Sequence, residues 1–72
     1  MTAYQRFTDY LQENDISLEF LMDALSPTDV SFMETTIKMM KMFNDDVFYD
    51  AAVRITERTL SNIEMLNSVY GI

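Results

Sequence analysis

The chain has 72 residues, of which 49% are hydrophobic, and its formal charge is −7, from twelve Asp and Glu residues against five Lys and Arg. This apolar content excludes a disordered acidic protein. A chain this short buries only about 60% of the surface that its unfolded form exposes, and it lacks the cysteine or histidine that a disulfide or a structural zinc site would need. We therefore expect one domain, residues 1–72, that relies on packing and self-association for stability.

The near absence of turn residues favours an all-α fold. One Gly and one Pro leave no Asn-Gly or Asp-Gly turns for hairpins. We predict a small bundle of three to four helices, at about 2–13, 17–25, 27–43 and 46–69, that dimerises. No apolar run approaches the roughly 20 residues of a membrane span, and no basic segment followed by an apolar core begins the chain. We expect a cytoplasmic protein, in the producing or the host cell.

Apolar residues at helical spacing define the first two helices. Residues 2–13 place Tyr4, Phe7 and Leu11 on one face, and Asn14 and Asp15 mark a break. In the second helix, one stripe is apolar and consists of Leu18, Leu21, Met22 and Leu25. A different face carries carboxylates every four residues, at Asp15, Glu19 and Asp23. Repulsion between neighbouring carboxylates is mildly destabilising, so this arrangement indicates more than solubility.

The third helix begins at the clearest boundary in the chain, where Ser26 is a predicted N-cap and Pro27 occupies the first helical position. Apolar residues cover nearly half its circumference, so it must be packed on more than one side. Its methionines fit either a core or an adaptable binding surface. We expect a core, with part of the helix at a homodimer interface formed by Phe32, Met33, Met39, Met40 and Phe43.

The fourth helix, about 46–69, would be roughly 36 Å long, which exceeds the diameter of so small a domain. We therefore expect it to overhang the other helices, with a second copy covering its excess length. Its predicted buried residues are Phe48, Ala51, Ala52, Ile55, Ile63, Leu66 and Val69. Gly71 is placed to end it.

The composition argues against catalysis and metal binding. With no His and no Cys, the usual general base and activated nucleophiles are missing, so we expect no enzyme and no cofactor. Asp45, Asp46 and Asp50 lack the alternating spacing, central Gly and closing Glu of a calcium loop. Helix capping explains these acids, and we expect no metal.

Two short segments resemble known families. Asp15-Ile16-Ser17-Leu18-Glu19 resembles the Asp-Ser-Leu start of the second helix in acyl carrier proteins, with Ile16 between the Asp and the Ser. The resemblance implies a phosphopantetheine arm on Ser17, whereas an N-cap explains the same serine; an acyl-carrier-like protein is a further alternative. The segment at 47–52 resembles the Phe-Tyr-x-Ala-Ala segment of the Hha family of nucleoid-associated modulators. That family continues with Asp-His-Arg and has a different charge balance, so we attribute the overlap to two amphipathic helices.

The charge is concentrated in the first half of the chain. Residues 1–37 carry seven carboxylates against Arg6 alone, and residues 38–72 carry five against four basic residues. Such a field attracts basic surfaces and repels phosphate backbones, so we expect no direct binding to nucleic acid or membrane. Phe20, flanked by carboxylates, has the character of an interface anchor. The predicted partner-binding residues are Asp9, Glu13, Asp15, Glu19, Phe20 and Asp23.

Our leading hypothesis is a small acidic interaction protein that docks this face on a basic surface of another protein. If that surface normally binds nucleic acid, the protein would inhibit it as a nucleic-acid mimic. By analogy, compact acidic helical proteins without cysteine are common among the accessory products of phages and mobile elements. The alternative is a helical structural or assembly adaptor, or a homo-oligomerisation module, that uses the Met-rich helix. In that case the acids would form only a solvated surface.

Overall fold

Residues 2–70, with the side chains of residues 2–68, are described by the structure, a computed structural model. These residues form four helices and no strand: α1 (Ala3–Glu13), α2 (Leu18–Ala24), α3 (Pro27–Met42) and α4 (Asp46–Tyr70). The predicted all-α fold is confirmed, and every predicted helix end lies within one residue of the observed end. The predictions for the Val69 side chain and for Gly71 lie outside the described part of the chain.

Side-chain caps explain where the helices begin. α1 opens with a capping box, in which the Thr2 hydroxyl accepts from the backbone N–H of Gln5 and the Gln5 side chain accepts from that of Thr2. Ser17 and Ser26 cap α2 and α3 by the same kind of contact. Because one such cap contributes about 1 kcal/mol, the caps matter in a domain of this size.

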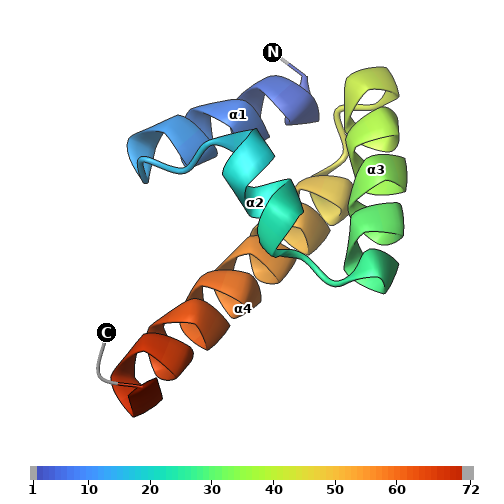
Figure 1. Ribbon diagram of the computed structural model, residues 1–72. Helices are drawn as coiled ribbons and strands as arrows, with labels where there is room; N and C mark the ends of the chain where they lie inside the picture. The colour runs from blue at the N-terminus through green and yellow to red at the C-terminus, as the bar shows by residue number, and fades with distance from the viewer. Residues whose placement is uncertain (1, 71–72) are drawn as a thin grey trace.

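The longest helix, α4, packs against each of the other three helices. α1 and α3 pack on its first half and on each other, while the short α2 crosses it (Figure 1). The core gathers residues from all four helices: Ala3, Phe7, Leu11, Leu21, Leu25, Met33, Met40, Ala52 and Ile55. Three buried threonines, Thr36, Thr56 and Thr59, donate their hydroxyls to carbonyls four residues earlier. These bonds satisfy the hydroxyls without a tertiary partner.

The last turns of α4 extend past the other helices, as expected from its length (Figure 1). The molecule measures 42 × 26 × 18 Å along its principal axes. The predicted burial of Leu66 is wrong, because its side chain is 51% exposed. The reason is that α2 has only seven residues and does not cover this part of α4, although Leu66 matches the apolar spacing of the helix.

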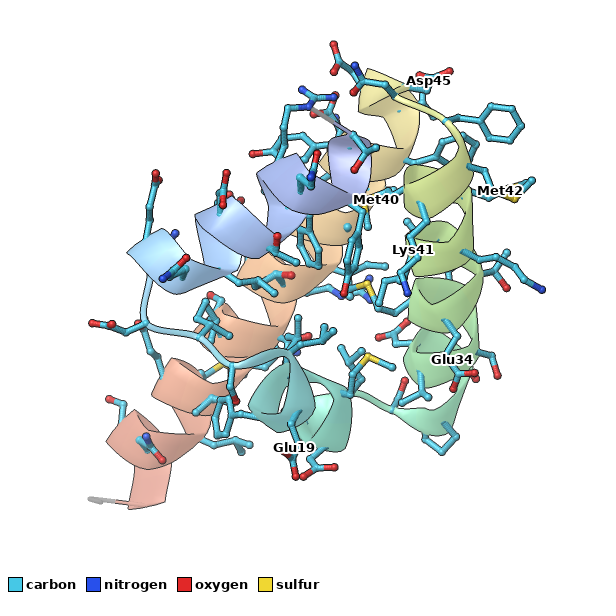
Figure 2. The ribbon with its side chains drawn as sticks, turned by 90° about the horizontal axis from the view of Figure 1, so that it is seen from above. Glu19, Glu34, Met40, Lys41, Met42 and Asp45 are labelled. Carbon is cyan, nitrogen blue, oxygen red and sulfur yellow. The ribbon has the colours of Figure 1, made fainter. Side chains whose placement is uncertain are left out.

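The broad apolar face of α3 divides between the core and the surface. Met33 and Met40 are fully buried within the single chain, and Met39 is half-buried. Phe32 and Phe43, by contrast, are about half exposed. Figure 2 shows Met40 directed toward the other helices and Met42 directed away from them.

Candidate functional site

Four carboxylates form what we call the acidic surface: Asp9 and Glu13 on α1, and Glu19 and Asp23 on α2. All four residues are exposed. Within each helix the two acids are four residues apart and therefore lie on one face, opposite the buried Phe7 of α1 and Leu21 of α2. The two helices are joined by a turn of four residues, which keeps the two pairs of acids on neighbouring elements (Figure 1).

Asp15 belongs to this turn and not to the carboxylate stripe of α2 that the sequence predicted. The backbone N–H of Ile16 donates to the carbonyl of Leu11, and that of Asp15 donates to the carbonyl of Gln12. These two bonds define a Schellman motif, with Asp15 at the left-handed position, φ 55°. The chain reverses direction here, so the spacing of four residues between Asp15 and Glu19 does not bring them onto one helix face.

Phe20 is the apolar side chain beside the acidic surface. It lies on α2 between Glu19 and Asp23 and is 53% exposed. Its backbone N–H donates to the hydroxyl of Ser17, the N-cap of α2. The capping role accounts for Ser17. Ile16 also has carboxylates near it in the sequence, but its side chain packs against the core. Phe20 is therefore the aromatic side chain of α2 that a partner could contact.

Basic side chains neutralise acids elsewhere but not on the acidic surface. Arg6 points to the start of α4, where it is 2.6 Å from Asp46 and lies over the ring of Tyr49. Arg58 is 2.8 Å from Asp29. Within residues 2–68, no salt bridge involves the four acids of the acidic surface. Surface salt bridges contribute little to stability. What matters here is that these two pairs leave the negative charge of the acidic surface uncompensated.

A second feature is a groove between α3 and the first half of α4, with a volume of about 590 Å³. Its lining residues are Asp29, Phe32, Val47, Asp50, Ala51, Arg54, Ile55 and Arg58. The predicted interface residue Phe32 lies here, whereas Met33 and Met40 lie inside the core, where a second copy could not touch them. Sequence reasoning missed the contribution of α4, although the spacing of Val47, Ala51 and Arg54 already places them on one face.

The described residues contain no group of three or more acids placed to hold a metal ion. Nor does any helix among them have both the length and the apolar character needed to cross a membrane. Comparison with protein-family models, curated proteins and solved structures finds no match to this chain. The arrangement offers exposed carboxylates, one exposed ring and an apolar groove, which are the components of binding surfaces.

Proposed function

We propose that this protein is a non-enzymatic interaction protein that docks its acidic surface, with Phe20 as the anchor, on a basic surface of another protein. The observation that carries the proposal is that Asp9, Glu13, Glu19 and Asp23 are exposed and lack salt bridges within the described side chains. A surface with acidic and basic residues interspersed would keep the protein soluble at least as well. Uncompensated charge of one sign instead increases the rate of encounter with a surface of the opposite sign.

Phe20 supplies the short-range contact that prolongs binding, which the charges do not. Long-range attraction increases the association rate, but it contributes little to residence time when the pairs stay at a hydrated rim. A half-exposed aromatic ring that becomes buried on binding slows dissociation. Phe20 lies on a helix whose start is capped and whose Leu21 is fully buried, so the ring is held on an ordered element.

A basic protein surface that binds nucleic acid is the partner class that fits this surface best. Such a surface is built to neutralise phosphates, and carboxylates presented from α1 and α2 would occupy it. The protein would then inhibit that partner by competition. The competition has a direct measurement: addition of the protein should displace a labelled nucleic acid from the purified partner, and variants of the acidic surface should lose this effect.

The first experiment compares two double variants of equal charge. Glu19→Gln with Asp23→Asn removes two charges from the acidic surface, and Glu34→Gln with Glu64→Gln removes two exposed charges elsewhere. A partner captured from lysate and then purified is measured by surface plasmon resonance at several salt concentrations. We expect the first variant to associate about tenfold more slowly, with a weaker dependence on salt, and the second to behave as the native protein does.

Phe20→Ala tests the anchor separately. We expect it to increase the dissociation rate at every salt concentration, because the ring contributes short-range contacts. Circular dichroism of each variant controls for folding. Equal association rates for the two double variants would contradict the proposal and show that the acids form only a solvated surface. An unchanged dissociation rate for Phe20→Ala would remove the ring from the site.

A further inference from the structure

The groove between α3 and α4 is bordered by apolar side chains that the single chain leaves exposed. Val47 is 69% exposed, and Phe32 and Phe43 are about half exposed. Phe43 also lies 6.5 Å from Phe48, measured between ring centroids, which joins the two helices at one end of this face. An exposed apolar face on a small domain marks an interaction surface. The groove contains no residue of α1 or α2, so it is distinct from the acidic surface.

The charges of the groove balance, in contrast to the −7 of the whole chain. Its lining contains two acids, Asp29 and Asp50, and two bases, Arg54 and Arg58. Asp29 and Arg58 pair with each other at 2.8 Å. Asp50 and Arg54 are both exposed and form no salt bridge within the described side chains. This face therefore presents one acid and one base, four residues apart on α4, each without a partner.

We propose that the occupant of the groove is a second copy of this chain, related by a two-fold axis that runs α4 antiparallel to its counterpart. A two-fold axis between positions 50 and 54 brings Asp50 of each copy near Arg54 of the other, so both unpaired charges gain partners at once. Ala51 lies between them and is small enough for the two helices to approach closely. Phe32 of each copy then covers Val47 of the other copy across the axis.

Charge complementarity selects a second copy over other occupants. A basic protein would be attracted first to the acidic surface, where the four acids form no salt bridge within the described side chains. An acidic one would be repelled by a molecule of charge −7. A second copy carries the same net negative charge, but its groove offers an acid for the unpaired base, a base for the unpaired acid, and apolar side chains for the apolar ones. The dimer leaves both acidic surfaces free, because no residue of α1 or α2 lines the groove.

Charge reversal at the two positions tests the arrangement. Sedimentation equilibrium at micromolar to submillimolar concentration should give the native protein twice the 8.4 kDa mass of the chain. Asp50→Arg alone and Arg54→Asp alone should each lose the dimer, because like charges then face each other across the axis. An equimolar mixture of the two single variants should recover the double mass, since each copy again meets opposite charges. Lys38→Asp, an exposed reversal on α3 outside the groove, should leave the native mass unchanged.

A native monomer at submillimolar concentration would overturn the proposal and leave the groove for a different protein. So would a mixture of the single variants that remains monomeric, provided that circular dichroism shows both to be folded. Phe32→Ala should weaken the dimer about tenfold or more without changing the effect of salt. The proposal is independent of partner docking at the acidic surface: the reversals at Asp50 and Arg54 change no acid of that surface, and Glu19→Gln with Asp23→Asn changes no residue of the groove.

Discussion

Asp15 shows how one residue can end a helix at a cost in stability. Its φ of 55° lies in the left-handed region, which costs a residue with a Cβ roughly 1–2 kcal/mol relative to the right-handed region. Glycine is the usual residue at this position of a Schellman motif because it lacks that cost. The two backbone bonds that close the motif do not involve the Asp15 side chain.

We therefore expect Asp15→Gly to increase the free energy of unfolding by about 1 kcal/mol, since it relieves the backbone cost. Urea denaturation followed by circular dichroism provides the measurement. Asp15→Ala is the matched control, because it removes the charge, retains a Cβ and has no side chain that favours the left-handed region. If the Ala variant is stabilised as much as the Gly variant, the effect arises from charge repulsion and not from the backbone.

Tyr10 titrates differently in the folded and unfolded chains. Burial raises the pKa of its hydroxyl above the ordinary value of 10.0, and the nearby Glu57 and Tyr49 raise that pKa further. The folded state thus favours the protonated phenol. By linkage, this contribution to stability is present below about pH 10 and is lost as the pH rises through the folded pKa.

We expect the native protein to lose stability from pH 9 to pH 11 more steeply than Tyr10→Phe does, as judged by urea denaturation at each pH. The ring of the variant keeps its stacking on Phe7, 6.2 Å away between centroids, and the ionisable group is gone. Every other ionisable group is common to the two proteins, so the difference between them isolates Tyr10. Identical slopes would contradict the expectation.

At the scale of the element, α3 shows that neighbouring methionines have opposite surroundings. Met40 has no exposed surface and Met42 is 66% exposed, because a step of two residues turns a helix by about 200°. Figure 2 shows the two side chains on opposite sides of the ribbon, with Lys41 between them in sequence. Lys41 itself lies over the ring of Tyr4, 4.8 Å from its centroid, and this contact links α3 to α1.

This contrast gives a matched pair of substitutions. Met40→Asp should unfold the protein, because an unpaired charge in a buried site costs several kcal/mol, as much as a small domain has in total. Met42→Asp introduces the same charge on the same helix at an exposed site and should change stability by less than about 0.5 kcal/mol. Thermal unfolding monitored at 222 nm distinguishes them. A folded Met40→Asp protein would place that side chain on a surface.

At the scale of the whole molecule, the acidic surface and the groove lie on different helices, the first on α1 and α2 and the second on α3 and α4. The acids of α1 and α2 lack salt bridges within the described side chains, whereas Arg6 is paired with Asp46 of α4 and Arg58 with Asp29 of α3. Arg6 is the only basic residue of the first 37 positions, and its pairing with Asp46 carries it away from the neighbouring carboxylates. The acidic surface is thus the proposed docking site for a basic partner, and the groove is the proposed contact with a second copy.

Much of this architecture is readable in the sequence. Cap residues such as Ser17 and Ser26 and the apolar spacing of Phe7, Leu11 and Leu21 are local properties, since a helix and its ends depend on residues within four positions of one another. The same local reasoning finds the exposed position of Phe20 and the excess length of α4, and the charge block from Asp9 to Glu34 follows from composition alone.

Only the tertiary structure decides which apolar positions are covered, because coverage depends on the lengths and crossings of helices far apart in the chain. Leu66 has core spacing but no neighbour long enough to cover it, and Phe32 borders a groove that exists only where α3 meets α4. Pairings of long range, such as Arg6 with Asp46, likewise join residues forty positions apart. Asp15 fell outside the predicted stripe for a related reason: a left-handed turn residue redirects the chain, and spacing in sequence then ceases to measure position on a helix face.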